Sequence, residues 1–274
     1  MLDYLPIDLP GESYTKLNQR LNKKEYVKIC KELTKNKYSV VKASEALELY
    51  DKSKIQIPDK VRIIWIHDVE RPSENWLAEE MARLENKYGF SSTFNIRTFC
   101  AMTEELRKPL LNIIKLGGEI QYQYEDLVAA RGNVGKARVL FKKNLAYLRK
   151  FFRKINTAFA HGVWLSGIDS TKQFYTNNEW DPALWIERGI HKNGELYYFI
   201  KLLRGQFKEK FHYIGESRCL GASEFVSALR KTKPGDIVMF LQHPTWWTDI
   251  IDIKKLKYCF RESIFFKKAK KSLG

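Results

Sequence analysis

Short apolar runs alternate along the chain with longer segments in which apolar residues recur at helical spacing. Residues 61–66, for example, are almost entirely apolar and rich in β-branched side chains, and a polar tetrapeptide follows them. Such runs predict buried strands, and the periodic segments predict helices that cover them. We expect strands at residues 38–41, 61–66, 92–96, 119–124, 157–160, 211–214 and 236–241. We expect helices at residues 25–34, 43–50, 74–88, 103–116, 134–151 and 222–229.

The alternation of strands and helices predicts parallel βαβ units. Their number suits an α/β barrel or a distorted relative of one. Residues 1–59 precede the main pattern and are expected to form a helical N-terminal extension packed on the barrel. Residues 60–253 would form the barrel itself, and residues 254–274 a basic C-terminal tail.

Polar and ionisable side chains follow several of the predicted strands directly, and three of the five histidines are among them. In barrels the carboxyl ends of the strands meet at one mouth, so we expect these side chains to form a common site. The alternative is that each one satisfies backbone groups of its own loop, as Asp and His often do. The side chains in question are His67, Asp68, Glu70, Gln123, Glu125, His161 and His243.

The composition adds an excess of basic residues, with 48 Lys and Arg against 32 Asp and Glu, for a formal net charge of +16. This balance favours anionic partners such as nucleic acid, anionic lipid or an acidic glycan, and it equally suits a solvated, lysine-rich surface. No nucleic-acid motif accompanies the charge, so nucleic acid ranks last among these partners. Hydrophobic residues make up 44% of the chain, which excludes a disordered protein.

The sequence favours a cytoplasmic location. No run approaches the roughly 18 apolar residues of a membrane span, and the first ten residues lack the features of a secretory signal. The four cysteines lie far apart and form no CxxC pair, which suits a reducing compartment.

The tail at residues 254–274 mixes large apolar side chains, such as Phe260, Ile264 and Phe265, with several lysines. One interpretation is a basic amphipathic helix that docks peripherally on the anionic inner face of a membrane. The other is a solvated terminus without a partner.

Several segments, taken in order and spacing, resemble the polysaccharide deacetylase (NodB-homology) superfamily, which is carbohydrate esterase family 4-like. The resemblance covers about residues 60–247, and residues 213–218 add a further element to it. The main segments are IHDVERP at 66–72, GFSSTF at 89–94, GEIQYQYEDL at 118–127, HG at 161–162 and LQHP at 241–244.

The resemblance implies a distorted (β/α)7-type barrel that removes acetyl groups from N-acetylated sugars with the help of a divalent, zinc-like metal ion. Carried over by position, Asp68 would be the catalytic base, Glu70 the carboxylate ligand of the metal and His243 the general acid. His161 falls where the family places a residue that contacts the site.

Two positions depart from the pattern of this family. Gln123 stands where this branch has a metal-binding histidine, and the second histidine of the pair would fall at Leu127. A neutral amide is a poor ligand for a transition metal. The metal is therefore either absent or held by a different shell, in which Asp68 or Glu70 would act with His67, His161 or His243. Of these, Glu70 and His67 are the ligands we expect.

We predict a deacetylase-like hydrolase that acts on an N-acetylated glycan or a lipid-linked sugar precursor, with Asp68, His161 and His243 as catalytic residues. The main alternative is a degenerate homologue that binds glycan without turnover, and a basic nucleic-acid-binding protein ranks behind both. Trp246 would stack on the sugar, although an aromatic residue of this kind is as well suited to core packing. The expected substrate-binding residues are Gln123, Glu125, Arg218 and Trp246.

Overall fold

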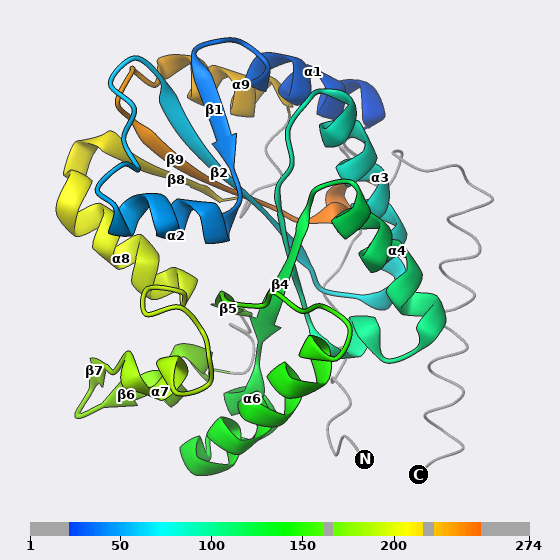
Figure 1. Ribbon diagram of the computed structural model, residues 1–274, viewed down its shortest axis with the longest axis vertical. Coiled ribbons are helices and arrows are strands. Elements are labelled where there is room, and N and C mark those ends of the chain that lie inside the picture. The colour runs from blue at the N-terminus through cyan, green and yellow to red at the C-terminus, as the bar shows by residue number, and fades with distance from the viewer. Residues whose placement is uncertain (1–21, 162–166, 216–221, 248–274) are drawn as a thin grey trace.

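The computed structural model describes residues 22–161, 167–215 and 222–247, which form an α/β fold around one parallel sheet (Figure 1). The strand order is β5-β4-β3-β2-β9-β8, and β1 also pairs with β2. A separate two-stranded antiparallel ribbon joins β6 and β7. The strands are β1 Tyr38–Val41, β2 Val61–Val69, β3 Thr93–Ile96, β4 Glu119–Tyr124, β5 Ala158–Ala160, β6 Tyr175–Thr176, β7 Glu179–Trp180, β8 Phe211–Gly215 and β9 Ile237–Gln242.

The strand β2 organises the sheet because it is long enough to pair with three neighbours. On one side it pairs with β9 along most of its length. On the other side β1 covers its first half, where Val41 pairs with Ile64, and β3 covers its second half, where Ile66 pairs with Thr93. The segment expected as an N-terminal extension therefore contributes a strand to the central sheet.

Helices connect the parallel strands and cover both faces of the sheet. Figure 1 shows α2 and α8 on one side, and α3 and α4 on the other. The α-helices are α1 Lys23–Leu33, α2 Ala43–Asp51, α3 Asn75–Lys87, α4 Glu104–Lys115, α5 Asp126–Ala129, α6 Val134–Arg149, α7 Ala183–Ile186, α8 Leu196–Phe207 and α9 Ala222–Lys231. Short 3-10 helices are η2 Pro72–Glu74, η3 Thr98–Ala101, η5 Ser170–Phe174, η6 Lys208–Lys210 and η7 Pro244–Trp246.

The two faces of β2 belong to two different cores, because successive side chains of a strand point to opposite faces. Ile63 and Trp65 pack outward into the larger core, beneath α1, α3, α4, α6 and α9. Ile64 and Ile66 face inward and share a second core with residues of α2 and α8. We call the second face the concave face and the first the convex face.

The sheet curls around the concave face. Phe159 of β5 and Phe211 of β8 come from opposite ends of the strand order, yet both belong to the concave core. The result is a half-barrel that stays open between β5 and β8 within the described residues, in agreement with the expected distorted barrel. None of the helices built from the described residues combines the length and the apolar character of a bilayer span.

Candidate active site

Polar side chains occupy the concave face at the carboxyl ends of the strands, directly above the apolar concave core. On β2 the inward series runs from Ile64 and Ile66 to the buried Asp68. The neighbouring strands continue the polar rim in the same register, since Asp68 pairs with Asn95. The side chains that reach this rim from β2, β3, β4, β5 and β9 or just beyond them are Asp68, Glu70, Asn95, Arg97, Gln123, Glu125, His161 and His243.

A carboxylate–imidazole cluster, formed by Glu70, Glu125, His161 and His243, lies at this rim. Nε2 of His161 is 3.0 Å from Oε1 of Glu70, and Nδ1 of His161 is 3.3 Å from Oε2 of Glu125. Nε2 of His243 approaches the same Oε1 of Glu70 at 3.3 Å. Four strand ends that are far apart in the sequence thus meet at one place.

The cluster holds Glu70, Glu125 and His161 in their charged forms. Burial alone would lower the pKa of His161, but hydrogen bonds to Glu125 and Glu70 raise it to about 9. Burial would likewise raise the pKa of Glu70, and the bonds from His161 and His243 instead hold it well below its usual range. At neutral pH His161 is therefore an imidazolium that donates to two carboxylates.

Asp68 lies beside this cluster and is only 3% exposed. Burial raises the pKa of Asp68 to about 6, against the opposing charge of His243 and a hydrogen bond from Asn95. That bond joins Nδ2 of Asn95 to Oδ1 of Asp68 at 2.9 Å. Asp68 is thus ionised at neutral pH and yet basic enough to accept a proton, as a general base must.

Two further side chains, Arg97 and Glu74, bind residues of the cluster or their backbone. Arg97 forms an ion pair with Glu125 and also donates to the backbone carbonyl of Glu70 at 3.3 Å. Glu74 accepts a hydrogen bond from the backbone N–H of Glu70 at 2.8 Å. Burial, with the nearby charge of Glu70, raises the pKa of Glu74 to about 7. These contacts fix the turn that carries Glu70 beyond the end of β2.

Arg97, Asn95 and Glu74 were not among the predicted site residues. A signal for Asn95 and Arg97 was present, because Asn95 lies near the carboxyl end of β3 and Arg97 directly follows the strand. Only the apolar Ile96 separates the two residues. The same rule that selected the ends of other strands would have selected them. Glu74 had no such signal, since its contact to the backbone of Glu70 depends on the local turn.

The residues present do not fit the metal triad that the family resemblance implies. Gln123 reaches the concave face with 1% exposure, and neither atom of its amide has a hydrogen-bond partner in the described structure. Both ring nitrogens of His161 contact carboxylates, so the imidazolium has no lone pair to offer a metal. Within residues 22–161, 167–215 and 222–247, no group of three or more His, Cys, Asp or Glu side chains is arranged to hold a metal ion.

The placement of His67 corrects one expectation. The strand β2 does not stop at Ile66 but continues to Val69, so His67 points to the convex face while Asp68 points to the concave face. His67 is fully buried, where its Nε2 lies 2.7 Å from Oε1 of Glu85 and its ring stacks on Phe94. His67 therefore does not meet Glu70, and it is not a ligand of a site at the rim.

Two predicted substrate contacts cannot be placed. Arg218 lies outside the described residues, and of Trp246 only the backbone, in η7, lies within them. The next residue, Trp247, is buried in the convex core edge-on against Tyr26. The tail at residues 254–274 also lies outside the described part of the chain.

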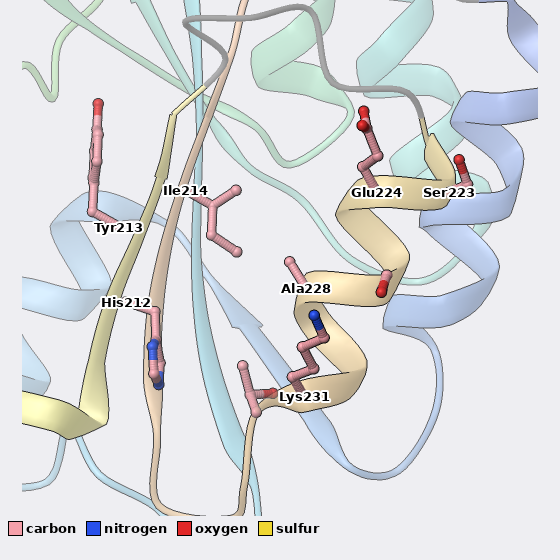
Figure 2. A pocket seen from close by; sticks show the side chains of 9 residues that line it. His212, Tyr213, Ile214, Ser223, Glu224, Ala228 and Lys231 are labelled. Carbon is pink, nitrogen blue, oxygen red and sulfur yellow. The ribbon is translucent and has the colours of Figure 1, made fainter.

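A groove of about 840 Å³ lies between β8 and α9, apart from the rim. Figure 2 shows Ile214 turned toward α9 and Tyr213 turned away from it. His212 lines the groove and contacts Asp236 at 3.1 Å. The groove thus opens on the convex side of β8, and none of the cluster residues lines it.

Comparisons with known proteins give structural neighbours only, since no protein family and no curated protein matches the sequence. A family 4 carbohydrate esterase from Bacillus anthracis is similar at 13% identity, covering 88% of this chain and 85% of that one, with a TM-score of 0.40. A CE4 family pseudoenzyme from Bacillus anthracis shares 14% identity over 74% of this chain and 62% of that one, with a TM-score of 0.36. Peptidoglycan deacetylase PdaC from Bacillus subtilis shares 13% identity over 76% of this chain and 96% of that one, with a TM-score of 0.34.

Two of these structures are described as members of carbohydrate esterase family 4. The identities and TM-scores are low, so the chemistry of this chain has to rest on its own side chains.

Proposed function

We propose that this chain is a deacetylase-like hydrolase of an N-acetylated glycan or glycolipid precursor, with Asp68 as the base and His243 as the acid. The observation that carries the proposal is the convergence of Asp68 with the carboxylate–imidazole cluster at one rim. Both His243 and His161 lie near enough to Asp68 to lower its pKa against the effect of burial. A base that activates water and an acid that protonates the leaving nitrogen are two groups that amide hydrolysis uses.

Each residue has a distinct task in the proposed reaction. Asp68 takes a proton from a water molecule as the water oxygen bonds to the acetyl carbon. His161, whose two ring nitrogens are bound to Glu70 and Glu125, holds these carboxylates in place beside the reacting groups. His243 gives a proton to the sugar nitrogen as the carbon–nitrogen bond breaks, and acetate and a free amine leave. Because the residues do not fit a metal triad, no step is assigned to a metal.

Glu125 and Gln123 have different parts in this proposal. Glu125 already binds Arg97 and His161, so it positions the imidazolium rather than the sugar. Gln123 retains an amide without a partner among the described residues, and that amide is suited to a polar group of the substrate.

The same observation on Gln123 favours a second candidate, a glycan-binding protein without turnover. A neutral amide replaces a residue that the family uses for catalysis, while a buried amide without a partner retains full hydrogen-bonding capacity for a ligand. The two candidates differ in one product, which is acetate.

The deciding experiment measures acetate release from N-acetylglucosamine oligomers by the wild-type chain, with added Zn²⁺ and with a chelator. Asp68→Asn should lower the rate by about 10²–10⁴-fold, the usual contribution of a general base. Asp51→Asn, a change of the same type at a surface ion pair with His191, should leave the rate unchanged. Saturable oligomer binding without acetate under both metal conditions would support the second candidate. Equal rates for Asp68→Asn and Asp51→Asn would exclude the assignment of Asp68.

A further inference from the structure

The outward face of α6 concentrates positive charge without any acidic residue nearby in the sequence. No Asp or Glu occurs between Asp126 and Asp169, although acidic residues make up 32 of the 274 residues of the chain. The exposed basic residues of this segment are Arg131, Lys136, Lys142, Lys143, Lys150, Arg153 and Lys154. None of them forms an ion pair with another described residue, whereas several lysines elsewhere do.

The arrangement on the helix is ordered. Lys136, Lys143 and Lys150 are seven residues apart, so they form one row that is about 21 Å long at 1.5 Å per residue. Beside this row, at the centre of the exposed face, lie Val139 and Ala146, which are both exposed. Lys142 lies on the other side of them. Val139 is 54% exposed, the largest fraction among the large hydrophobic side chains left exposed in the described structure.

We propose that this basic face of α6 docks on an anionic lipid bilayer. A central line of small and apolar side chains with lysines on both sides lets the apolar atoms enter the interface while the lysine amines reach the headgroups. The unpaired lysines supply attraction to anionic lipid.

The composition of the face favours lipid over nucleic acid. The exposed residues of α6 include no aromatic side chain on which bases could stack. They also include no Asn, Gln or Arg that could read a base edge, and an exposed valine has no role against phosphates. The charge alone would suit both partners, so Val139 distinguishes them.

The position of α6 connects the surface to the candidate site. The chain runs from Glu125 at the rim through α5 and a short turn at residues 130–133 into α6. The start of the basic face thus lies near the rim, and docking would bring the rim close to the bilayer. This would suit a lipid-linked substrate, but the membrane contact itself does not depend on the proposed hydrolase activity.

The test uses the full chain and sedimentation with vesicles of equal parts phosphatidylglycerol and phosphatidylcholine, at low and high salt. Lys136→Glu/Lys143→Glu should weaken binding at low salt by about tenfold or more, since each lysine near such a surface contributes about fivefold. The matched control Lys52→Glu/Lys54→Glu changes the net charge equally at exposed positions away from α6 and should bind within about twofold of wild type. Equal losses in both variants would overturn the proposal.

A second variant separates lipid from nucleic acid and also serves if the charge variant fails to fold. Val139→Asn keeps the charge and alters one exposed side chain, so the melting temperature should not change. It should weaken binding to the anionic vesicles several-fold and leave binding to a duplex DNA unaffected. Unchanged vesicle binding by Val139→Asn would overturn the proposal. So would tighter binding of the wild type to the duplex than to the vesicles at the same salt.

Discussion

Two histidine–glutamate pairs in this molecule have the same chemistry and opposite surroundings. His67 and Glu85 lie 2.7 Å apart on the convex side of β2, with side chains that are 0% and 1% exposed. His161 and Glu70 lie 3.0 Å apart on the concave rim, with side chains that are 15% and 24% exposed. Solvent reaches only the second pair, so only the second pair can meet a substrate.

The neighbours of the two pairs differ as well. Glu85 also accepts hydrogen bonds from Tyr26 and Ser92, each at 2.6 Å, so its oxygens are satisfied inside the core. The pair at the rim is joined by another imidazole, another carboxylate and Asp68. The comparison teaches that ionisable residue types alone do not define a site, whereas the face of the strand that carries them does.

The largest expected effect concerns the buried pair. His67→Ala leaves Glu85 buried without its imidazole, so the free energy of unfolding should fall by about 3–5 kcal/mol. His161→Ala removes a side chain that solvent partly reaches and screens, so it should cost less, about 2 kcal/mol. Urea unfolding followed by circular dichroism measures both values. Similar losses in the two variants would break the distinction between a structural pair and a rim pair.

A smaller effect concerns the pH dependence of stability. The pKa of His161 is raised in the folded chain from 6.5 to about 9, since its hydrogen bonds to Glu125 and Glu70 outweigh burial. Its contribution to stability is therefore complete below about pH 6.5 and is lost as the pH rises through about 9. His161→Gln should flatten the stability profile in this window. A wild-type profile that is already flat between these values would contradict the charge assigned to His161.

The smallest effect concerns Gln123. Its buried amide has no hydrogen-bond partner among the described residues, so Gln123→Met should raise the free energy of unfolding by about 1 kcal/mol. The same variant should bind N-acetylglucosamine oligomers more weakly, because the amide is lost. Calorimetry and urea unfolding on one preparation measure both effects. A destabilised variant with unchanged binding would show that Gln123 is structural.

Much of the fold could be predicted from the alternation of apolar runs and periodic segments, which placed most strands within one or two residues. The end of β2 could not be predicted, because the chain remains extended through residues 67–69, which the sequence pattern assigns to a loop. Because β2 extends to Val69, His67 lies on the convex face rather than in a loop at the rim. The helix α8 was not predicted, although Glu195 caps its start through the backbone of Tyr198 and its apolar side chains fill the concave core.

Part of the candidate site could also be predicted from the order of the strands. The carboxyl ends of parallel strands meet at one edge, which brought Asp68, Glu70, His161 and His243 together. The pairing within the cluster was not predictable, since it depends on side-chain directions and on the curl of the sheet. The role of Arg97 in holding Glu125 emerged only from the geometry.

The pH dependence of acetate release at saturating substrate tests the central claim most directly. If Asp68 is the base in the concave site, the rate should fall about tenfold per pH unit below about pH 6, the pKa to which burial raises Asp68. The residual rate of Asp68→Asn should not show that fall. A wild-type rate that stays constant from pH 5 to pH 7, within about twofold, would contradict the account.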